Sequence, residues 1–329
     1  IKVGKNTVAA TGMYSGWGLK TFTEEALEKI HVATLEILRT TGVSIDCDEA
    51  LDILHEGGCW VNKKTRVARF PDHVVSQVIP LCPSHILLAG RDPENDFMMG
   101  GKKVGFTTFG VGVFTEDLET GELRESTKED VAQIARLTDA LPNMDILTAP
   151  VAATDKPDES YDLHMLEAAL TNSSKHYASD AEDGDRAKLL IEMAAAVAGG
   201  HDKLKERPIM SFGVCPTSPL QIIQATAEVI MEAARNWIPI NILSMVMAGA
   251  SSPISISGAL VMHNAEVLAG IVLSQLTNPG APVIYGSSST TLDMQHATAV
   301  VGVPEMAMIS AGAAELSNFY GIPSYVAGG

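Results

Sequence analysis

The sequence predicts an α/β protein, a TIM (β/α)8 barrel that is C-terminally incomplete in this chain, with an N-terminal helical cap. Short apolar runs rich in β-branched residues alternate with longer helical runs after residue 100. Strands that are apolar on both faces and separated by helices are typical of parallel βα units. The units recur at roughly 30–40 residues, and a complete barrel takes about 250 residues for eight of them. A doubly wound open sheet is the alternative architecture.

Residues 1–100 predict a separate, mostly helical segment that serves as a cap or an oligomerisation layer. Thr23 is the expected N-cap of its first long helix, with two glutamates in the following turn, and Gly42 ends that helix. Two short helices are expected next, one near 50–56 and one after Pro71. A homo-oligomer is expected from the apolar helices predicted at 256–276 and 304–320, although burial against the barrel is an alternative explanation for their apolar character.

Residues 101–329 are predicted to form the partial (β/α)8 barrel, with about seven strands present. The expected strands lie at 104–109, 146–151, 176–179, 209–214, 240–247, 282–285 and 324–327. The expected helices between them lie at 128–141, 159–172, 185–198, 219–236, 256–276 and 304–320. Because the seventh strand reaches the last residues, we expect the final part of the barrel to be missing here.

The composition limits the possible partners. The chain has 329 residues, 46% of them hydrophobic, and a formal net charge of −17. Nucleic acids and anionic membranes both attract basic segments, so this charge argues against either partner. The longest apolar run, 254–276, holds His263, Asn264 and Glu266, which predicts a buried helix rather than a membrane span. Four scattered cysteines indicate reduced thiols and a cytoplasmic protein.

The last third of the sequence contains no lysine or arginine after Arg235. Side chains of this stretch cannot clamp a phosphate or a carboxylate, so its ligand is expected to be neutral or positively charged. No His-x-His or H-E-x-x-H pattern occurs, which argues against a metal centre. No lysine ends a predicted strand, so a Schiff-base mechanism lacks its nucleophile.

Active sites of barrels lie at the carboxyl ends of the strands. The predicted ends offer hydroxyls, glycines, methionines and aromatic rings, and Asp180 either acts there or caps the next helix. Met245 and Met247 would face the same way on one strand, where they either fill the core or line a pocket. The polar residues within 254–276 fall mid-helix and are expected to satisfy buried partners.

Several long motifs lie near these strand ends. They are Ser211–Leu220, Asn241–Pro253, His263–Gly270 and Tyr285–Thr291, continued by Val303–Glu305 and Phe319–Gly329. In this order they resemble the trimethylamine:corrinoid methyltransferase family, and the resemblance covers essentially the whole chain.

The resemblance implies a TIM barrel that transfers a methyl group from trimethylamine to the Co(I) corrinoid of a cognate corrinoid protein, in methylamine catabolism and methanogenesis. The partner presents the corrinoid (cobalamin), so this chain is expected to bind no cofactor tightly. In the trimethylamine-specific members the catalytic residue is pyrrolysine, encoded by an amber codon a few residues after a Gly-Gly pair. We therefore expect pyrrolysine just beyond Gly329.

Two alternatives to this activity stay open. Related family members without pyrrolysine demethylate quaternary amines such as glycine betaine, and a sense codon after Gly329 would favour that activity. The chain is alternatively an inactive fragment that binds the corrinoid protein.

A methylammonium cation favours aromatic faces and nearby carboxylates. The predicted substrate-binding residues are the aromatics near strand ends and two carboxylates, namely Phe109, Phe212, Tyr285, Tyr325, Asp180 and Glu266. The predicted corrinoid-facing residues lie in the loops at the barrel mouth, and they are Cys215, Thr217, Ser218, Met245, Met247, Ser251, Ser287, Ser288 and Thr290. No metal ligand is predicted.

Overall fold

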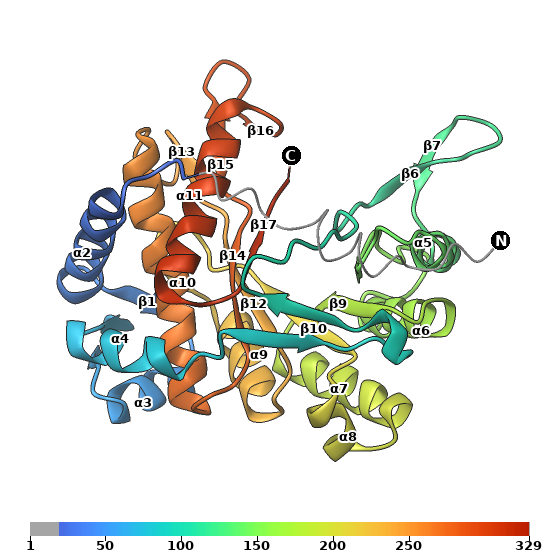
Figure 1. Ribbon diagram of the computed structural model, residues 1–329, viewed down its shortest axis with the longest axis horizontal. Coiled ribbons are helices and arrows are strands. Elements are labelled where there is room, and N and C mark those ends of the chain that lie inside the picture. The colour runs from blue at the N-terminus through green and yellow to red at the C-terminus, as the bar shows by residue number, and fades with distance from the viewer. Residues whose placement is uncertain (1–19, 329) are drawn as a thin grey trace. The chain divides into compact units, whose positions relative to one another are not determined.

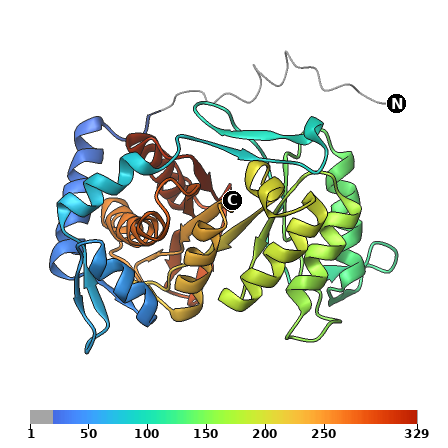
Figure 2. The ribbon, with the colours of Figure 1, turned by 90° about the horizontal axis from the view of Figure 1, so that it is seen from below.

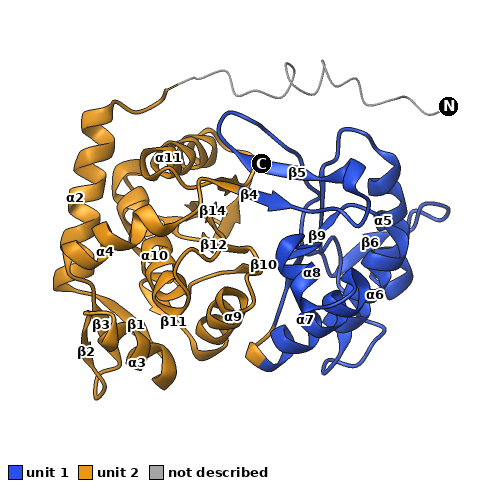
Figure 3. Cartoon of the chain, turned by 60° about the horizontal axis from the view of Figure 1, so that its bottom comes forward, with its two compact units in different colours: residues 1–17, 86–181, 185–212 blue, residues 18–85, 182–184, 213–329 orange. Residues whose placement is uncertain are grey.

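The computed structural model describes residues 20–328. The chain forms two compact units, which Figure 3 shows in different colours. The described parts of unit 1 are 86–181 and 185–212, and those of unit 2 are 20–85, 182–184 and 213–328. Each unit is described by itself below.

The N-terminal part of unit 2 contains three helices and a small sheet. Its elements are α2 (Glu24–Thr40), β1 (Val43–Ile45), α3 (Asp48–Glu56), β2 (Trp60–Asn62), β3 (Val67–Arg69), α4 (Asp72–Val78) and the 3-10 helix η1 (Ile79–Leu81). The Thr23 side chain accepts a hydrogen bond from the backbone N–H of Ala26, which confirms the predicted N-cap. Gly42 adopts a φ of +79°, a left-handed conformation that favours glycine, directly after α2.

The C-terminal part of unit 2 consists of βα units. Its elements are β11 (Gln221–Ile222), α9 (Gln224–Arg235), β12 (Ile240–Ser244), β13 (Met247–Ala248), α10 (Ile256–Thr277), β14 (Val283–Ser287), β15 (Thr290–Asp293), β16 (Thr298–Val300), α11 (Pro304–Tyr320) and β17 (Ser324–Val326). β12, β14 and β17 are neighbours in one sheet and run parallel. α10 and α11 pack against this sheet (Figure 1).

Helix α10 is the central helix of unit 2. It packs against α2, α3, α4, α9 and α11 as well as the strands, and Figure 2 shows it end-on in orange. In the described part of the chain it is also the one helix long and apolar enough to span a membrane. Most of its residues are buried within the protein, however, as expected for the core helix of a globular unit.

Unit 1 also alternates strands and helices. Its elements are β4 (His85–Leu88), η2 (Pro93–Asn95), β5 (Phe97–Gly100), β6 (Phe114–Glu116), β7 (Leu123–Glu125), α5 (Lys128–Ala140), β8 (Ile146–Thr148), α6 (Tyr161–Asn172), β9 (His176–Asp180), α7 (Gly184–Ala198), α8 (His201–Glu206) and β10 (Met210–Val214). β8 and β9 pair in parallel, and Tyr177 N–H donates to the carbonyl of Ile209 before β10.

The predicted strand at 104–109 is wrong as a regular strand. Thr107 of this segment makes an isolated parallel bridge to Ile146 of β8, and Gly112 beyond the segment makes another to Val151. Between them Thr108 Oγ1 donates to the carbonyl of Thr148 at 2.8 Å and accepts from its N–H at 3.0 Å. Here a side chain therefore takes the place of the backbone ladder.

Three further predicted boundaries differ from the structure by three residues or more. The strand predicted at 146–151 ends at Thr148. β12 ends at Ser244, and Met247 belongs to β13, which pairs with β15 in another sheet. The helix predicted from residue 219 begins only at Gln224, because a tight turn at 217–221 and the short strand β11 precede it. The other predicted helices occur with ends shifted by three residues at most.

The predicted division of the chain at residue 100 stays a prediction. Within unit 2, α2, α3 and α4 pack directly on α10. Residues 1–19 of the predicted N-terminal segment lie outside the described residues.

Candidate functional site

The carboxyl ends of β12, β14 and β17 lie side by side in unit 2. Ser244 is in register with Ser287, and Ser287 is in register with Val326. Ser244 and Ser287 are fully buried, and Ser288 N–H donates to the carbonyl of Ser244 at 3.0 Å. Because the active sites of barrels lie at this edge, these strand ends and the loops after them form the candidate site of unit 2.

Glu266 of α10 lies beneath this edge and is fully buried. Its Oε2 atom accepts hydrogen bonds from the hydroxyls of Ser244 at 2.6 Å and Ser218 at 2.8 Å. Its Oε1 atom accepts from the backbone N–H of Leu220 at 3.0 Å. Burial raises the pKa of Glu266, and the three hydrogen bonds oppose that shift.

His263 lies one turn before Glu266 and faces the same edge. Its Nδ1 atom is 3.2 Å from the Ser289 hydroxyl, which in turn donates to the carbonyl of Ser244 at 3.1 Å. Its Nε2 atom is buried and has no hydrogen-bond partner among residues 20–328. Burial lowers the pKa of His263 to about 3, so the imidazole is neutral at neutral pH.

Asn264 connects the sheet with the N-terminal helix. Its Oδ1 atom accepts from the Tyr285 hydroxyl at 2.8 Å, and its Nδ2 atom donates to Tyr320 at 2.7 Å and Thr34 at 3.0 Å. Tyr320 is also 2.9 Å from Nδ1 of His31. These contacts confirm that Asn264 satisfies buried partners.

The opposite face of this sheet points away from α10. Side chains alternate along strands, so Asn241, Leu243, Gly286 and Tyr325 share that face, while Tyr285 faces α10. Gly286 allows the Asn241 amide to lie close, since a Cβ atom there would be 2.2 Å from Asn241 Oδ1. Tyr325 is in register with Gly286 and is half-buried. Sequence reasoning missed Asn241, although its polar side chain within an apolar strand was a usable signal.

In unit 1, three predicted substrate-binding residues occupy very different environments. Asp180 ends β9 and its side chain reaches solvent, yet the surrounding protein excludes enough water to raise its pKa to about 6. Phe109 is 81% exposed, whereas Phe212 is fully buried in β10. These three residues stay predictions, as do Glu266, Tyr285 and Tyr325 in unit 2.

The predicted corrinoid-facing residues all belong to unit 2. Those at its surface are Cys215, Thr217 and Met245; the half-buried ones are Ser218, Met247, Ser251 and Ser288; and Ser287 and Thr290 are buried. The Ser251 hydroxyl accepts from the backbone N–H of Met247 at 2.9 Å and so shapes the loop after β12. Because β12 ends at Ser244, Met245 and Met247 do not share one strand.

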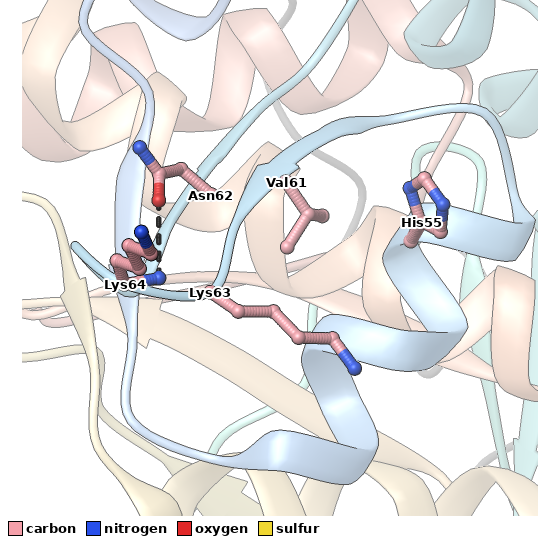
Figure 4. A pocket seen from close by; sticks show the side chains of 5 residues that line it. All are labelled: His55, Val61, Asn62, Lys63 and Lys64. Atoms are coloured by element: carbon pink, nitrogen blue, oxygen red, sulfur yellow. Dashed lines mark hydrogen bonds between the residues drawn. The ribbon is translucent and has the colours of Figure 1, made fainter.

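Two shallow depressions lie elsewhere on unit 2. The larger, of about 510 Å³, is lined by His55, Val61, Asn62, Lys63 and Lys64 (Figure 4). Asn62 Oδ1 accepts there from the backbone N–H of Lys64 at 3.0 Å. The smaller lies on α2. Neither includes a residue from the carboxyl ends of β12, β14 or β17. Among residues 20–328 no group of three or more His, Cys, Asp or Glu side chains is placed to hold a metal ion.

Comparison with known proteins identifies the family of the chain. The trimethylamine methyltransferase (MTTB) family matches residues 14–329. The chain belongs to this family.

The curated MTTB-family relatives include proteins with two named substrates. The chain is 50% identical over 321 residues to "Trimethylamine methyltransferase MttB" of Desulfitobacterium hafniense, covering 98% of this chain and 65% of the relative. It is 42% identical over 328 residues to the MttB of Methanosarcina thermophila, covering 98% and 68%. It is 36% identical over 308 residues to a "Glycine betaine methyltransferase" of D. hafniense, covering 93% and 64%. The chain thus spans about two thirds of the length of these relatives.

A solved structure shows the same fold. The Methanosarcina barkeri monomethylamine methyltransferase (MtmB) matches with a TM-score of 0.56 at 14% identity, covering 92% of this chain and 67% of that chain. At this identity the likeness concerns the fold alone. It confirms the predicted α/β TIM-barrel class for this MTTB-family chain.

Proposed function

We propose that the protein transfers a methyl group from trimethylamine to the Co(I) corrinoid of a cognate corrinoid protein, in cytoplasmic methylamine catabolism or methanogenesis. The observation that carries this proposal is the 50% identity, over 98% of the chain, to a relative named trimethylamine methyltransferase. The relative named for glycine betaine is less similar, at 36%.

The chemistry of the proposed reaction requires a positive nitrogen. Breaking the C–N bond of a neutral amine would expel an amide anion, which is a poor leaving group, so the nitrogen is protonated or bonded to a further group before its methyl carbon moves to cobalt. The C–N bond then breaks with its electron pair on nitrogen, and Co(I) supplies the electron pair of the new carbon–cobalt bond. A protonated amine leaves directly as dimethylamine, whereas an adduct releases dimethylamine once its bond to the further group is broken. Pyrrolysine, which the proposal places beyond Gly329, would supply the adduct or positioning chemistry at that nitrogen.

The charges and aromatic rings of the described residues fit a positively charged substrate. No lysine or arginine follows Arg235, so no side-chain cation of residues 236–328 repels an ammonium ion at the unit 2 strand ends. Asp180 is ionised above a pH of about 6 and is available to attract a cation in unit 1. Tyr325 presents a half-buried aromatic ring, which suits a cation–π contact.

The decisive experiment uses the full-length protein. It is mixed with trimethylamine and the cognate Co(I) corrinoid protein, and the absorbance of methyl-cobalt is followed over time. Mono- and dimethylamine and glycine betaine serve as parallel substrates. Formation of methyl-cobalt with trimethylamine and with none of the other substrates supports the proposal. Formation of methyl-cobalt with glycine betaine supports the quaternary-amine alternative.

The gene provides an independent test. An in-frame UAG within a few codons after that of Gly329, followed by further homologous sequence, supports the trimethylamine activity. Sense codons throughout that stretch contradict it and favour the quaternary amine. If the corrinoid protein binds but no amine is demethylated, only the role of an inactive binding fragment is left.

A further inference from the structure

We infer that Glu266 is a positioning residue that holds the turn 217–221 against the end of β12 at the barrel mouth. This inference rests on the proposed function, because it assigns the turn a part in methyl transfer. It differs from the direct substrate contact expected for Glu266 from the sequence.

The carboxylate is fully used by neighbouring groups. Oε2 accepts from Ser218 and Ser244, and Oε1 accepts from the N–H of Leu220. The side chain has no exposed surface. A substrate ammonium would have to displace these donors to reach it, so the geometry favours a role through the turn.

The charge of Glu266 is balanced by these neutral donors. Among the ion pairs of residues 20–328 none involves Glu266, and burying a carboxylate is costly unless hydrogen bonds compensate it. Hydrogen bonds to an ionised acceptor are about twice as strong as those between neutral groups. The three donors and the carboxylate therefore hold each other in place.

The turn itself depends on being held. Leu220 has a φ of +56°, a left-handed conformation that non-glycine residues adopt only when their surroundings impose it. Its N–H is fixed by Glu266, and its carbonyl accepts from the N–H of Ser44 in β1 at 2.9 Å. Thr217 and Gln221 close the turn with two backbone hydrogen bonds of 2.8 and 2.9 Å.

The position of the turn explains its proposed effect on the reaction. Ser218 lies within it, and Ser244 ends β12, so one carboxylate oxygen joins two segments of the strand-end region. Cys215 and Thr217, which are exposed beside it, are among the predicted corrinoid-facing residues. Releasing the turn would therefore misplace the loop that the partner approaches.

The test compares two buried polar residues of α10 in the full-length protein. Glu266→Gln keeps the size of the side chain but removes its charge and one acceptor oxygen. The matched control is Gln275→Met on the same helix. Gln275 makes two hydrogen bonds to the loop before β14, donating to the carbonyl of Ala281 and accepting from the N–H of Gly280, both at 2.8 Å. That loop lies at the amino end of the strand.

We expect Glu266→Gln to lower kcat by about ten- to hundredfold, the range for losing a hydrogen bond to a charged group. KM for the amine should change by less than about threefold, because the substrate contacts remain. Hydrogen exchange of the amides in 217–222 should become about tenfold faster or more. Gln275→Met should lower Tm but leave both kcat and the hydrogen exchange of 217–222 unchanged.

Milder variants keep the test decisive if Glu266→Gln does not fold. Ser218→Ala and Ser244→Ala each remove one donor and leave the carboxylate in place, and each should raise exchange in the turn and lower kcat. An unchanged kcat, unchanged exchange in 217–222, or an equal loss of kcat in Gln275→Met overturns the inference. If the unmodified protein methylates no corrinoid, the proposed function fails, while the exchange measurement still decides whether Glu266 holds the turn.

Discussion

Replacing Asn264 with leucine should destabilise unit 2 by about 3 kcal/mol. The substitution keeps the volume but removes all three hydrogen bonds of the amide, to Tyr285, Tyr320 and Thr34. The fully buried Tyr285 hydroxyl donates to Asn264 and to no other described residue. Leaving this hydroxyl without a partner should lower the free energy of unfolding by about 1–3 kcal/mol. Tyr320 and Thr34 each keep a second partner, so each of them loses only about 0.5–1.5 kcal/mol.

The assay is urea unfolding at neutral pH, followed by tryptophan fluorescence, since Trp60 and Trp237 both belong to unit 2. Asn318→Leu is the matched control, because Asn318 lies exposed on α11 and should change stability by less than about 0.5 kcal/mol. The double variant Asn264→Leu/Tyr285→Phe should be almost as stable as Asn264→Leu. Tyr285→Phe alone leaves Asn264 Oδ1 unpaired and should lower the free energy of unfolding by about 1–3 kcal/mol. Additive effects of the two substitutions, within about 0.5 kcal/mol, would refute the reasoning.

Three other predictions concern titrating groups. Burial lowers the pKa of His263 to about 3 and of His176 to about 4, so the unfolded chain binds more protons below pH 6.5. The free energy of unfolding should therefore be highest above pH 6.5 and lower by about 2 kcal/mol per histidine at pH 5. Urea titrations of His263→Gln should show a weaker dependence on pH. Burial raises the pKa of Asp180 to about 6, so methyl transfer should rise as pH passes through 6, and Asp180→Asn should abolish that limb of the pH–rate profile. Asp130 belongs to the capping box of α5 and pairs with Arg124, which lowers the pKa of its carboxyl to about 2. Asp130→Asn should lower the free energy of unfolding by about 1–2 kcal/mol at pH 7, and by less as pH falls from 4 toward 2. Thermal melts at pH 3 and pH 7 measure this difference.

Helix positions were predictable from the sequence because their signals are local. Thr23 accepts a hydrogen bond from a backbone N–H at the start of α2. Helix α11 starts at Pro304, and Gly321 in a left-handed conformation directly follows its last residue, as capping rules require. The burial of the polar residues of α10 was also predictable. A long apolar helix with polar groups in its middle is buried, and Asn264 and Glu266 find hydrogen-bond partners inside the protein.

Strand ends were less predictable because pairing partners are distant in sequence. Residues 104–109 have the composition of a strand, but Thr108 occupies the backbone groups of Thr148 with its own side chain. The segment 240–247 looks continuous, yet Met247 pairs with Thr290 in a different sheet from β12. Hydrophobic periodicity contains no information about either partner.

The sequence by itself determined the family, the fold class and the acidic, cation-poor character of the last third of the chain. These properties depend on residue order and composition, which are complete before the chain folds. Only the tertiary structure decided the surroundings of Glu266, because its hydrogen-bond donors Ser218, Leu220 and Ser244 lie 22 to 48 residues away along the chain. Folding brings the turn, the strand end and the helix to one point, so the carboxylate is enclosed by three donors that no sequence pattern links to it.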